Sequence, residues 1–187
     1  MDRLIVIMFV SAWGYAEVRA QARAGRAPGA ATADRGSLLA LYLSITLGYG
    51  LAFAASYLPV ARLPGEQPAF LLVGGVLVAA GLWIRYRAIA TLRASFRYRV
   101  EFVPGHRLVE TGPYGHIRNP GYAGQLLVFL GVAVALASWL SIIGLMVPVA
   151  GAFLWRIRVE EAALRDEFGE VFDAYARRTA RLVPGLV

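Results

Sequence analysis

Residues 119–155, NPGYAGQLLVFLGVAVALASWLSIIGLMVPVAGAFLW, form a run of 37 residues without a charged side chain. A helix that crosses a bilayer needs about 20 residues. The run is therefore too long for one crossing and fits two short crossings better. The predicted turn is Ser138–Ser141, and we expect a helical hairpin whose two outer ends lie at the same membrane surface.

The rest of the chain is also rich in apolar segments. Of its 187 residues, 58% are hydrophobic, and the mean hydropathy is +0.57, whereas soluble domains are about 45–50% apolar. Two further stretches, 36–61 and 67–84, carry no charge. The expected fold class is an all-α integral membrane protein with about five membrane-spanning helices, including the hairpin. The first three are expected at Leu4–Val18, Ser37–Tyr57 and Ala69–Leu92, so the chain divides into an N-terminal membrane part, 1–92, and a C-terminal part, 93–187.

The first expected helix permits a second interpretation, because Leu4–Ala12 resembles the apolar core of a signal peptide. The charges of Asp2 and Arg3 cancel, whereas a signal peptide begins with a net positive region. A retained first helix is therefore favoured.

The net charge is +7, and every basic side chain except the two histidines is an arginine. The arginines flank the apolar spans, which indicates a role in membrane orientation and headgroup contact, with no nucleic-acid partner. They gather in the segment after the first span, in 85–118 and in the tail from Arg156 on. Since cytoplasmic loops carry the excess of arginine, the C-terminus and the polar loops are expected on the cytoplasmic side, in what we expect to be a bacterial cytoplasmic membrane.

Several kinds of chemistry are excluded by composition. There is no cysteine and no lysine, so disulfides, thiolate nucleophiles and lysine Schiff bases are impossible. The two histidines, His106 and His116, are too few for a histidine-based metal centre, and no metal is expected.

Two polar regions lie at the ends of the predicted hairpin. The first is 106–122, where Gly112-Pro113 indicates a turn and Asn119-Pro120 begins a helix well. Taken alone, this region is equally well explained as a rigid connector. The second is the tail, where Arg156, Glu160, Leu164, Phe168 and Phe172 recur every four residues and predict an amphipathic interfacial helix that Gly169 interrupts and 170–181 resumes. Because the ends of a hairpin lie together, the two regions are expected to meet and form a pocket open to water and to lipid.

These residues resemble the isoprenylcysteine carboxyl methyltransferase family and its bacterial relatives, which are similar to the phospholipid methyltransferases. The family pattern is His-x-Leu-Val, Gly-x-Tyr, Arg-His-Pro-x-Tyr, Glu-Glu, Phe-Gly and Tyr-x-x-x-Arg. The matching residues occur in the same order: His106-Arg107-Leu108-Val109, Gly112-Pro113-Tyr114, Arg118-Asn119-Pro120-Gly121-Tyr122, Glu160-Glu161, Phe168-Gly169, and Tyr175 near Arg178. The resemblance covers about 95–185, and the first 90 residues match only as apolar spans.

The resemblance implies an enzyme that transfers a methyl group from S-adenosylmethionine to a lipophilic acceptor and leaves S-adenosylhomocysteine. It implies these cofactor-binding residues: His106, Arg107, Leu108, Val109, Tyr114, Asn119, Pro120, Gly121, Tyr122 and Glu160. It also implies that Arg156 faces the acceptor. Asn119 replaces the family histidine and, unlike histidine, cannot take up a proton near neutral pH; it can contact a cofactor but cannot act as a general base.

Elementary chemistry is compatible with this function. A tyrosine face can hold a sulfonium cation, and Glu160 can pair with the cofactor's ammonium group. A carboxylate acceptor needs no base, so catalysis would depend on alignment and desolvation. An amine or hydroxyl acceptor would need deprotonation, and Glu161 is then the nearest candidate, although a solvated carboxylate at the start of an interfacial helix is the favoured explanation of Glu161.

Two other functions fit parts of the sequence. A membrane NADPH-dependent sterol-type reductase has a similar Arg-x-Pro-x-Tyr turn, but Glu160-Glu161 and the ending 181–184 favour the methyltransferase. A non-enzymatic scaffold or transporter is the second alternative, and the predicted spans at 37–57 and 119–155 contain no charge that would mark a transport path. The glycines at Gly48, Gly50, Gly74 and Gly75 lie inside apolar spans, where they are expected to permit close helix packing.

Overall fold

The computed structural model describes residues 2–24, 36–92 and 108–185, and these are almost entirely helical. The elements are α1 (Asp2–Ala24), α2 (Ser37–Ala55), η1 (Pro59–Ala61), α3 (Gln67–Leu92), η3 (Gly112–Gly115), α4 (Pro120–Ala135), α5 (Trp139–Phe168) and α6 (Glu170–Arg178). Within these ranges the only β-type pairings are two isolated bridges. The expected all-α fold is confirmed.

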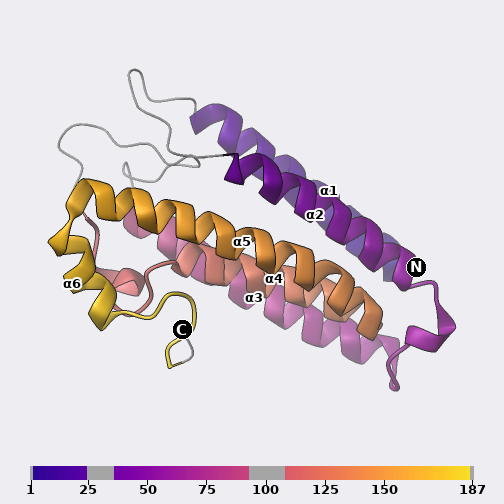
Figure 1. The fold of residues 1–187 in the computed structure, drawn as a ribbon. Coiled ribbons are helices and arrows are strands. Elements are labelled where there is room, and N and C mark those ends of the chain that lie inside the picture. The colour runs from indigo at the N-terminus through magenta and orange to yellow at the C-terminus, as the bar shows by residue number, and fades with distance from the viewer. Residues whose placement is uncertain (1, 25–35, 93–107, 186–187) are drawn as a thin grey trace.

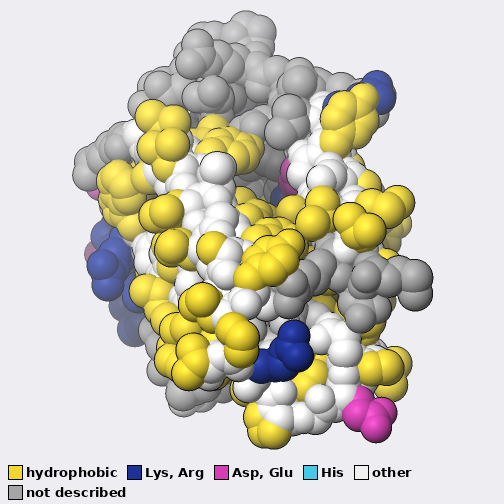
Figure 2. Space-filling view, turned by 90° about the vertical axis from the view of Figure 1, so that its right-hand side faces the viewer, with side chains coloured by type: hydrophobic (Ala, Val, Ile, Leu, Met, Phe, Trp, Pro, Cys, Tyr) yellow, Lys and Arg dark blue, Asp and Glu magenta, His cyan; other side chains and the backbone are white. Residues whose placement is uncertain are grey.

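Three helices, α2, α3 and α5, are long and apolar enough to cross a membrane. The apolar part of α1, Leu4–Glu17, and the 16-residue α4 are shorter. Many large apolar side chains on the outer faces of α2 and α3 are exposed, as expected for helices in contact with lipid. Figure 2 views the end of the bundle farthest from α6 and shows mostly hydrophobic and uncharged atoms, with few charged side chains. The chain is an integral membrane protein, whereas the number of crossings remains a prediction.

The hairpin turn lies slightly earlier than predicted. α4 ends at Ala135, Ala137 has a positive φ of 51°, and α5 begins after Ser138. Ser138 Oγ accepts a hydrogen bond from the backbone N–H of Ser141, which caps the helix. The prediction of Ser138–Ser141 as the turn was therefore wrong by about three residues, because Ser138 begins the second helix as its N-cap.

The tail does not begin a separate helix at Arg156. α5 runs without interruption from Trp139 to Phe168, although it contains Pro148, and the break comes at Gly169, which has a φ of 53°. The expected interruption at Gly169 is confirmed. α6 then covers Glu170–Arg178, three residues shorter than the predicted 170–181.

Glycine contacts bring the helices together in two antiparallel pairs. A Cβ atom at Gly74 of α3 would lie 2.5 Å from the carbonyl oxygen of Gly131 of α4, and a Cβ atom at Gly81 would lie 2.5 Å from that of Gly124. In the second pair, a Cβ atom at Gly48 of α2 would lie 3.0 Å from a side-chain methyl carbon of Leu145 in α5. The predicted packing role is confirmed at Gly48 and Gly74, while Gly50 and Gly75 have nothing within 4 Å of such an atom.

The long helices lie side by side (Figure 1). α6 folds back at the C-terminal end of α5, and the N-terminus of α1 lies at the opposite end of the bundle. The C-terminal half of α1 is joined to α3 by an ion pair in which Arg85 Nε and Nη2 donate to the Glu17 carboxylate, both at 2.9 Å. The buried core lies between α1, α2, α4 and α5.

Candidate active site

The polar loop before α4 docks against the segment after α6. The backbone N–H of Arg118 donates to Ala180 O at 2.8 Å, and that of Ala180 donates to His116 O at 3.0 Å. These bonds form a short parallel bridge between Ile117 and Ala180. The loop and the tail thus meet, as their positions at the ends of a hairpin led us to expect.

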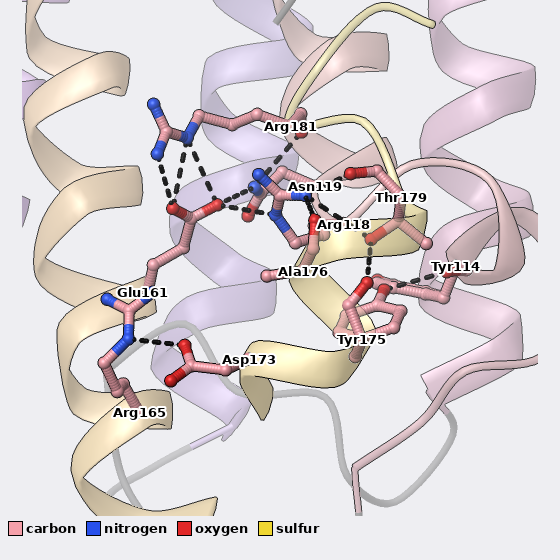
Figure 3. Close-up of polar contacts among 10 residues, drawn as sticks. All are labelled: Tyr114, Arg118, Asn119, Glu161, Arg165, Asp173, Tyr175, Ala176, Thr179 and Arg181. Atoms are coloured by element: carbon pink, nitrogen blue, oxygen red, sulfur yellow. Dashed lines mark hydrogen bonds and ion pairs between the residues drawn. The ribbon is translucent and has the colours of Figure 1, made fainter. Parts of the chain in front are cut away.

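Side chains reinforce this docking (Figure 3). Arg118 Nη1 donates to the carbonyl oxygens of Ala176, at 2.7 Å, and of Thr179. The Tyr175 hydroxyl donates to Tyr114 O at 2.8 Å. Burial, the largest cause, raises the pKa of Tyr175 to about 12, so this hydroxyl stays a neutral donor at physiological pH.

Glu161 is the centre of a cluster of positive and polar groups (Figure 3). Its carboxylate accepts from Arg118 Nε at 3.1 Å, from Arg181 Nε and Nη2 at 3.1 and 3.0 Å, and from Asn119 Nδ2 at 3.3 Å. Only 8% of its side chain is exposed. Two guanidinium groups pair with this carboxylate, and the cluster joins α5, the loop and the tail at one point.

Asn119 is used differently from its expected capping role. It occupies the position before α4 and Pro120 is the first helical residue, as predicted, but its side chain makes no capping hydrogen bond. Its Nδ2 group instead donates to Glu161 Oε1 and to Arg181 O at 3.2 Å. Both amide hydrogens are therefore directed at protein acceptors.

A second cluster lies on the adjacent face of α5. The Tyr122 hydroxyl of α4 donates to Glu160 Oε1 at 2.5 Å and accepts from Arg156 Nε at 2.9 Å. Arg156 also pairs with Glu160 at 2.9 Å and donates to Ser37 Oγ of α2 at 3.1 Å. Arg156 is 1% exposed, whereas 22% of the Glu160 side chain is accessible. The cluster connects three helices and leaves part of a carboxylate facing outward.

Tyr114 lies in η3, in the loop that docks on the tail. Burial raises the pKa of its phenol above the ordinary value, the charges of Tyr175 and Glu160 raise it further, and Arg85 opposes them. The Tyr114 phenol therefore stays neutral at physiological pH.

The structure describes most of the predicted site residues. Leu108 and Val109 are partly buried just before η3, and Gly121 approaches Ala88 of α3. His106 and Arg107 lie outside the described residues. Among the described ranges no three histidine, cysteine or carboxylate side chains form a group that could hold a metal ion.

Sequence reasoning missed several members of the two clusters. Ser37 lies about 120 residues from Arg156, and no local pattern indicates their contact. Arg181 was noted only as part of a terminal motif, although its guanidinium binds Glu161. The ion pair between Glu17 and Arg85 was not predicted either.

Residues 69–171 match the phospholipid methyltransferase family model. The chain belongs to this family. The matched range contains nearly all of α3, the whole of η3, α4 and α5, and the residues of both clusters except Ser37 and Arg181. The resemblance to the isoprenylcysteine carboxyl methyltransferases and their relatives is thus confirmed.

Relatives within the phospholipid methyltransferase family include plant proteins. Protein-S-isoprenylcysteine O-methyltransferase A of Arabidopsis thaliana is 32% identical over 150 residues, which cover 76% of each chain. A probable protein-S-isoprenylcysteine O-methyltransferase of Oryza sativa subsp. indica is 34% identical over 114 residues, and the match covers 60% of each chain. The chain therefore spans about 60% of the length of the rice relative.

A solved structure supports the fold of this family member. The eukaryotic intramembrane Ras methyltransferase ICMT (isoprenylcysteine carboxyl methyltransferase) matches with a TM-score of 0.63 and 24% identity. The superposition covers 78% of this chain and 52% of that protein. The arrangement of helices is therefore shared.

Proposed function

We propose that this protein transfers a methyl group from S-adenosylmethionine to a lipophilic acceptor at the membrane interface. The observation that carries the proposal is the Tyr122–Glu160–Arg156 cluster. The cluster brings charged and polar side chains of α4 and α5 together in an apolar bundle, inside the range that matches a methyltransferase family.

The residues present suit the chemical groups of this cofactor. It would supply a methyl group on a positively charged sulfur. The partly accessible Glu160 would pair with the ammonium group of its amino-acid part, and the rings of Tyr114 and Tyr122 would favour the sulfonium. Of the other residues predicted to bind the cofactor, Asn119 lies in the loop that the tail holds against Glu161, the next residue of α5.

The chain's own residues favour positioning over proton transfer. The Arg156 guanidinium pairs with Glu160 and orients it, and the buried Arg156 provides a fixed positive charge beside the acceptor. Glu161 is held by two arginines, whereas a general base must lie within hydrogen-bond reach of its proton, directly or through one water. We therefore propose that Glu161 is not the base and that the acceptor reacts without it, as a carboxylate does.

The proposed location of the site rests on the helices and on the arginines. Three helices are long and apolar enough to cross a membrane, and the arginine-rich segments indicate that the clusters face the cytoplasm. The cofactor would arrive from the aqueous side and the acceptor from the bilayer.

Transfer of a labelled methyl group from S-adenosylmethionine into a lipid extract, by the purified full-length protein, tests this function. Glu160→Gln is expected to lower transfer at least tenfold, because it removes the charge that faces the ammonium group. Glu167→Gln, an exposed change on the same helix, is the matched control. NADPH binding without S-adenosylmethionine binding would instead support the reductase. No labelled lipid product, with Glu160→Gln otherwise behaving as wild type, would support a scaffold.

A further inference from the structure

The Arg156 guanidinium is held by contacts from three helices. Its Nε donates to the Tyr122 hydroxyl of α4 at 2.9 Å, its Nη2 pairs with Glu160 of α5 at 2.9 Å, and its Nη1 donates to Ser37 Oγ of α2 at 3.1 Å. Only 2% of the Arg156 side chain is exposed. Because a guanidinium is planar and its donors have a fixed geometry, these contacts together determine how Nη2 meets the Glu160 carboxylate.

Ser37 makes its contact from the beginning of α2. It is the first residue of that helix, follows Gly36, which has a φ of 76°, and is 0% exposed. The first turn of a helix carries a partial positive charge, and that of α2 has no acidic residue. A guanidinium at this end is therefore unfavourable unless an oxygen accepts from it, as Ser37 Oγ does. Packing alone would be satisfied by an apolar side chain, so the buried hydroxyl points to a role for its contact with Arg156.

We propose that Ser37 is a positioning residue of the active site, which acts through Arg156 to hold the Glu160 carboxylate in place for the ammonium group of S-adenosylmethionine. The inference rests on the proposed function and deepens it. Without the hydroxyl, Arg156 Nη1 loses this acceptor, and the guanidinium can turn towards another oxygen at the expense of its contact with Glu160. Ser37 lies outside 69–171, the range that matches the family model, so the N-terminal part of the chain would contribute to the cofactor site.

The chain offers a matched control at the other end of the same helix pair. Ser141 Oγ of α5 donates to Ala52 O of α2 at 2.7 Å, and Ser141 is also 0% exposed. Ser141 and Arg156 are about 22 Å apart along α5, because a helix rises by about 1.5 Å per residue. Ser37→Ala and Ser141→Ala therefore each remove one buried hydroxyl between α2 and α5, but only Ser37→Ala removes it from the second cluster.

The test measures the affinity of the purified full-length protein for S-adenosylmethionine and for 5′-methylthioadenosine, which lacks the amino-acid part and therefore the ammonium group. Ser37→Ala is expected to weaken S-adenosylmethionine binding about threefold to tenfold, the change expected for one hydrogen bond, and to leave 5′-methylthioadenosine binding within about twofold. Ser141→Ala should lower the melting temperature by a few degrees, as Ser37→Ala does, and change neither affinity. Ser37→Thr keeps the hydroxyl and should retain the wild-type ratio of the two affinities, whatever the added methyl group does to the melting temperature.

A double-mutant cycle tests whether Ser37 acts through Glu160. In a Glu160→Gln background, Ser37→Ala should have no further effect on S-adenosylmethionine binding, because the carboxylate that Arg156 orients is gone. An effect of the same size with and without Glu160 would overturn the inference. Equal losses of affinity for the two ligands, or an unchanged affinity for S-adenosylmethionine, would also overturn it and leave Ser37 a packing residue.

Failure of the methyl-transfer proposal gives a different result. If wild type transfers no methyl group but the variants show the expected pattern of binding, the positioning role stands and the reaction does not. If wild type transfers a methyl group and Ser37→Ala binds both ligands as wild type does, the reaction stands and the positioning role does not. Binding of neither ligand by wild type would overturn both.

Discussion

The Tyr122 hydroxyl donates to Glu160 Oε1 at 2.5 Å while it accepts from Arg156 Nε at 2.9 Å. One phenol oxygen thus orients both charged partners of an ion pair on the neighbouring helix. The Tyr122 ring is held by Phe153 at 5.2 Å, so a phenylalanine at this position would keep the packing and lose only the hydroxyl.

Tyr122→Phe is expected to weaken S-adenosylmethionine binding about tenfold and to lower the free energy of unfolding by about 1–3 kcal/mol. The reason is that Arg156 Nε, which is buried, would lose its acceptor. Equilibrium binding of labelled cofactor and thermal unfolding measure the two effects. Unchanged binding with reduced stability would remove Tyr122 from the cofactor site and leave it a packing residue.

Glu161 and Arg181 are expected to act as one unit. Glu161→Gln, Arg181→Gln and the double variant should lower cofactor affinity by similar factors, because each one releases the tail from the same carboxylate. A double-mutant cycle on cofactor binding should give a coupling energy of about 1–3 kcal/mol.

A catalytic base at Glu161 predicts a different pattern. Glu161→Gln would then reduce kcat and remove one limb of its pH profile, and Arg181→Gln would largely retain kcat. That result would overturn the positioning role.

The α3–α4 contact should be sensitive to a single methyl group. Gly81→Ala places a Cβ atom 2.5 Å from Gly124 O, so the helices must separate, with an expected cost of about 1–3 kcal/mol. Gly75→Ala on the same helix meets nothing within 4 Å and is expected to leave stability unchanged or raise it, since alanine has the higher helix propensity. Thermal unfolding in detergent compares the two, and equal effects would show that the close approach does not contribute to stability.

The Tyr175 hydroxyl should contribute to the free energy of unfolding, and this contribution should not depend on pH in the physiological range. Its pKa is raised to about 12, above the ordinary value of about 10. The contribution is therefore complete below pH 10 and is lost as the pH rises from 10 to 12. The difference in unfolding free energy between wild type and Tyr175→Phe, expected near 1 kcal/mol, should be constant from pH 6 to 9 and shrink above 10. A difference that already changes between pH 7 and 9 would contradict this account.

The sequence predicted the apolar architecture well because apolar runs report burial or lipid contact directly. It also predicted that the loop and the tail meet, since a hairpin requires this. It failed where local signals compete. Ser138 can begin a turn or cap a helix, and here it caps α5. Asn119 has the preferred residue type for a cap, but Glu161 and Arg181 provide stronger partners for its amide.

The partners of the charged residues could not be predicted in the same way. Arg156 with Ser37, and Arg85 with Glu17, are joined only by the tertiary arrangement. An arginine near the end of an apolar span can either orient the chain in the membrane or form a buried ion pair. Only the positions of the neighbouring helices distinguish these possibilities.

The uninterrupted course of α5 gives its two adjacent carboxylates separate surroundings. Successive residues of a helix differ by about 100° in direction, so Glu160 meets Tyr122 while Glu161 meets Arg118 and Arg181. The two carboxylates therefore have different roles because they project from α5 in different directions. The continuous helix fixes those directions relative to the lipid-facing half of α5. Deleting one residue between Val149 and Ile157 would advance Glu161 into the position of Glu160 and leave the loop and the tail without their common anion. The number of residues between the start of α5 and its two carboxylates therefore decides which partners each carboxylate meets.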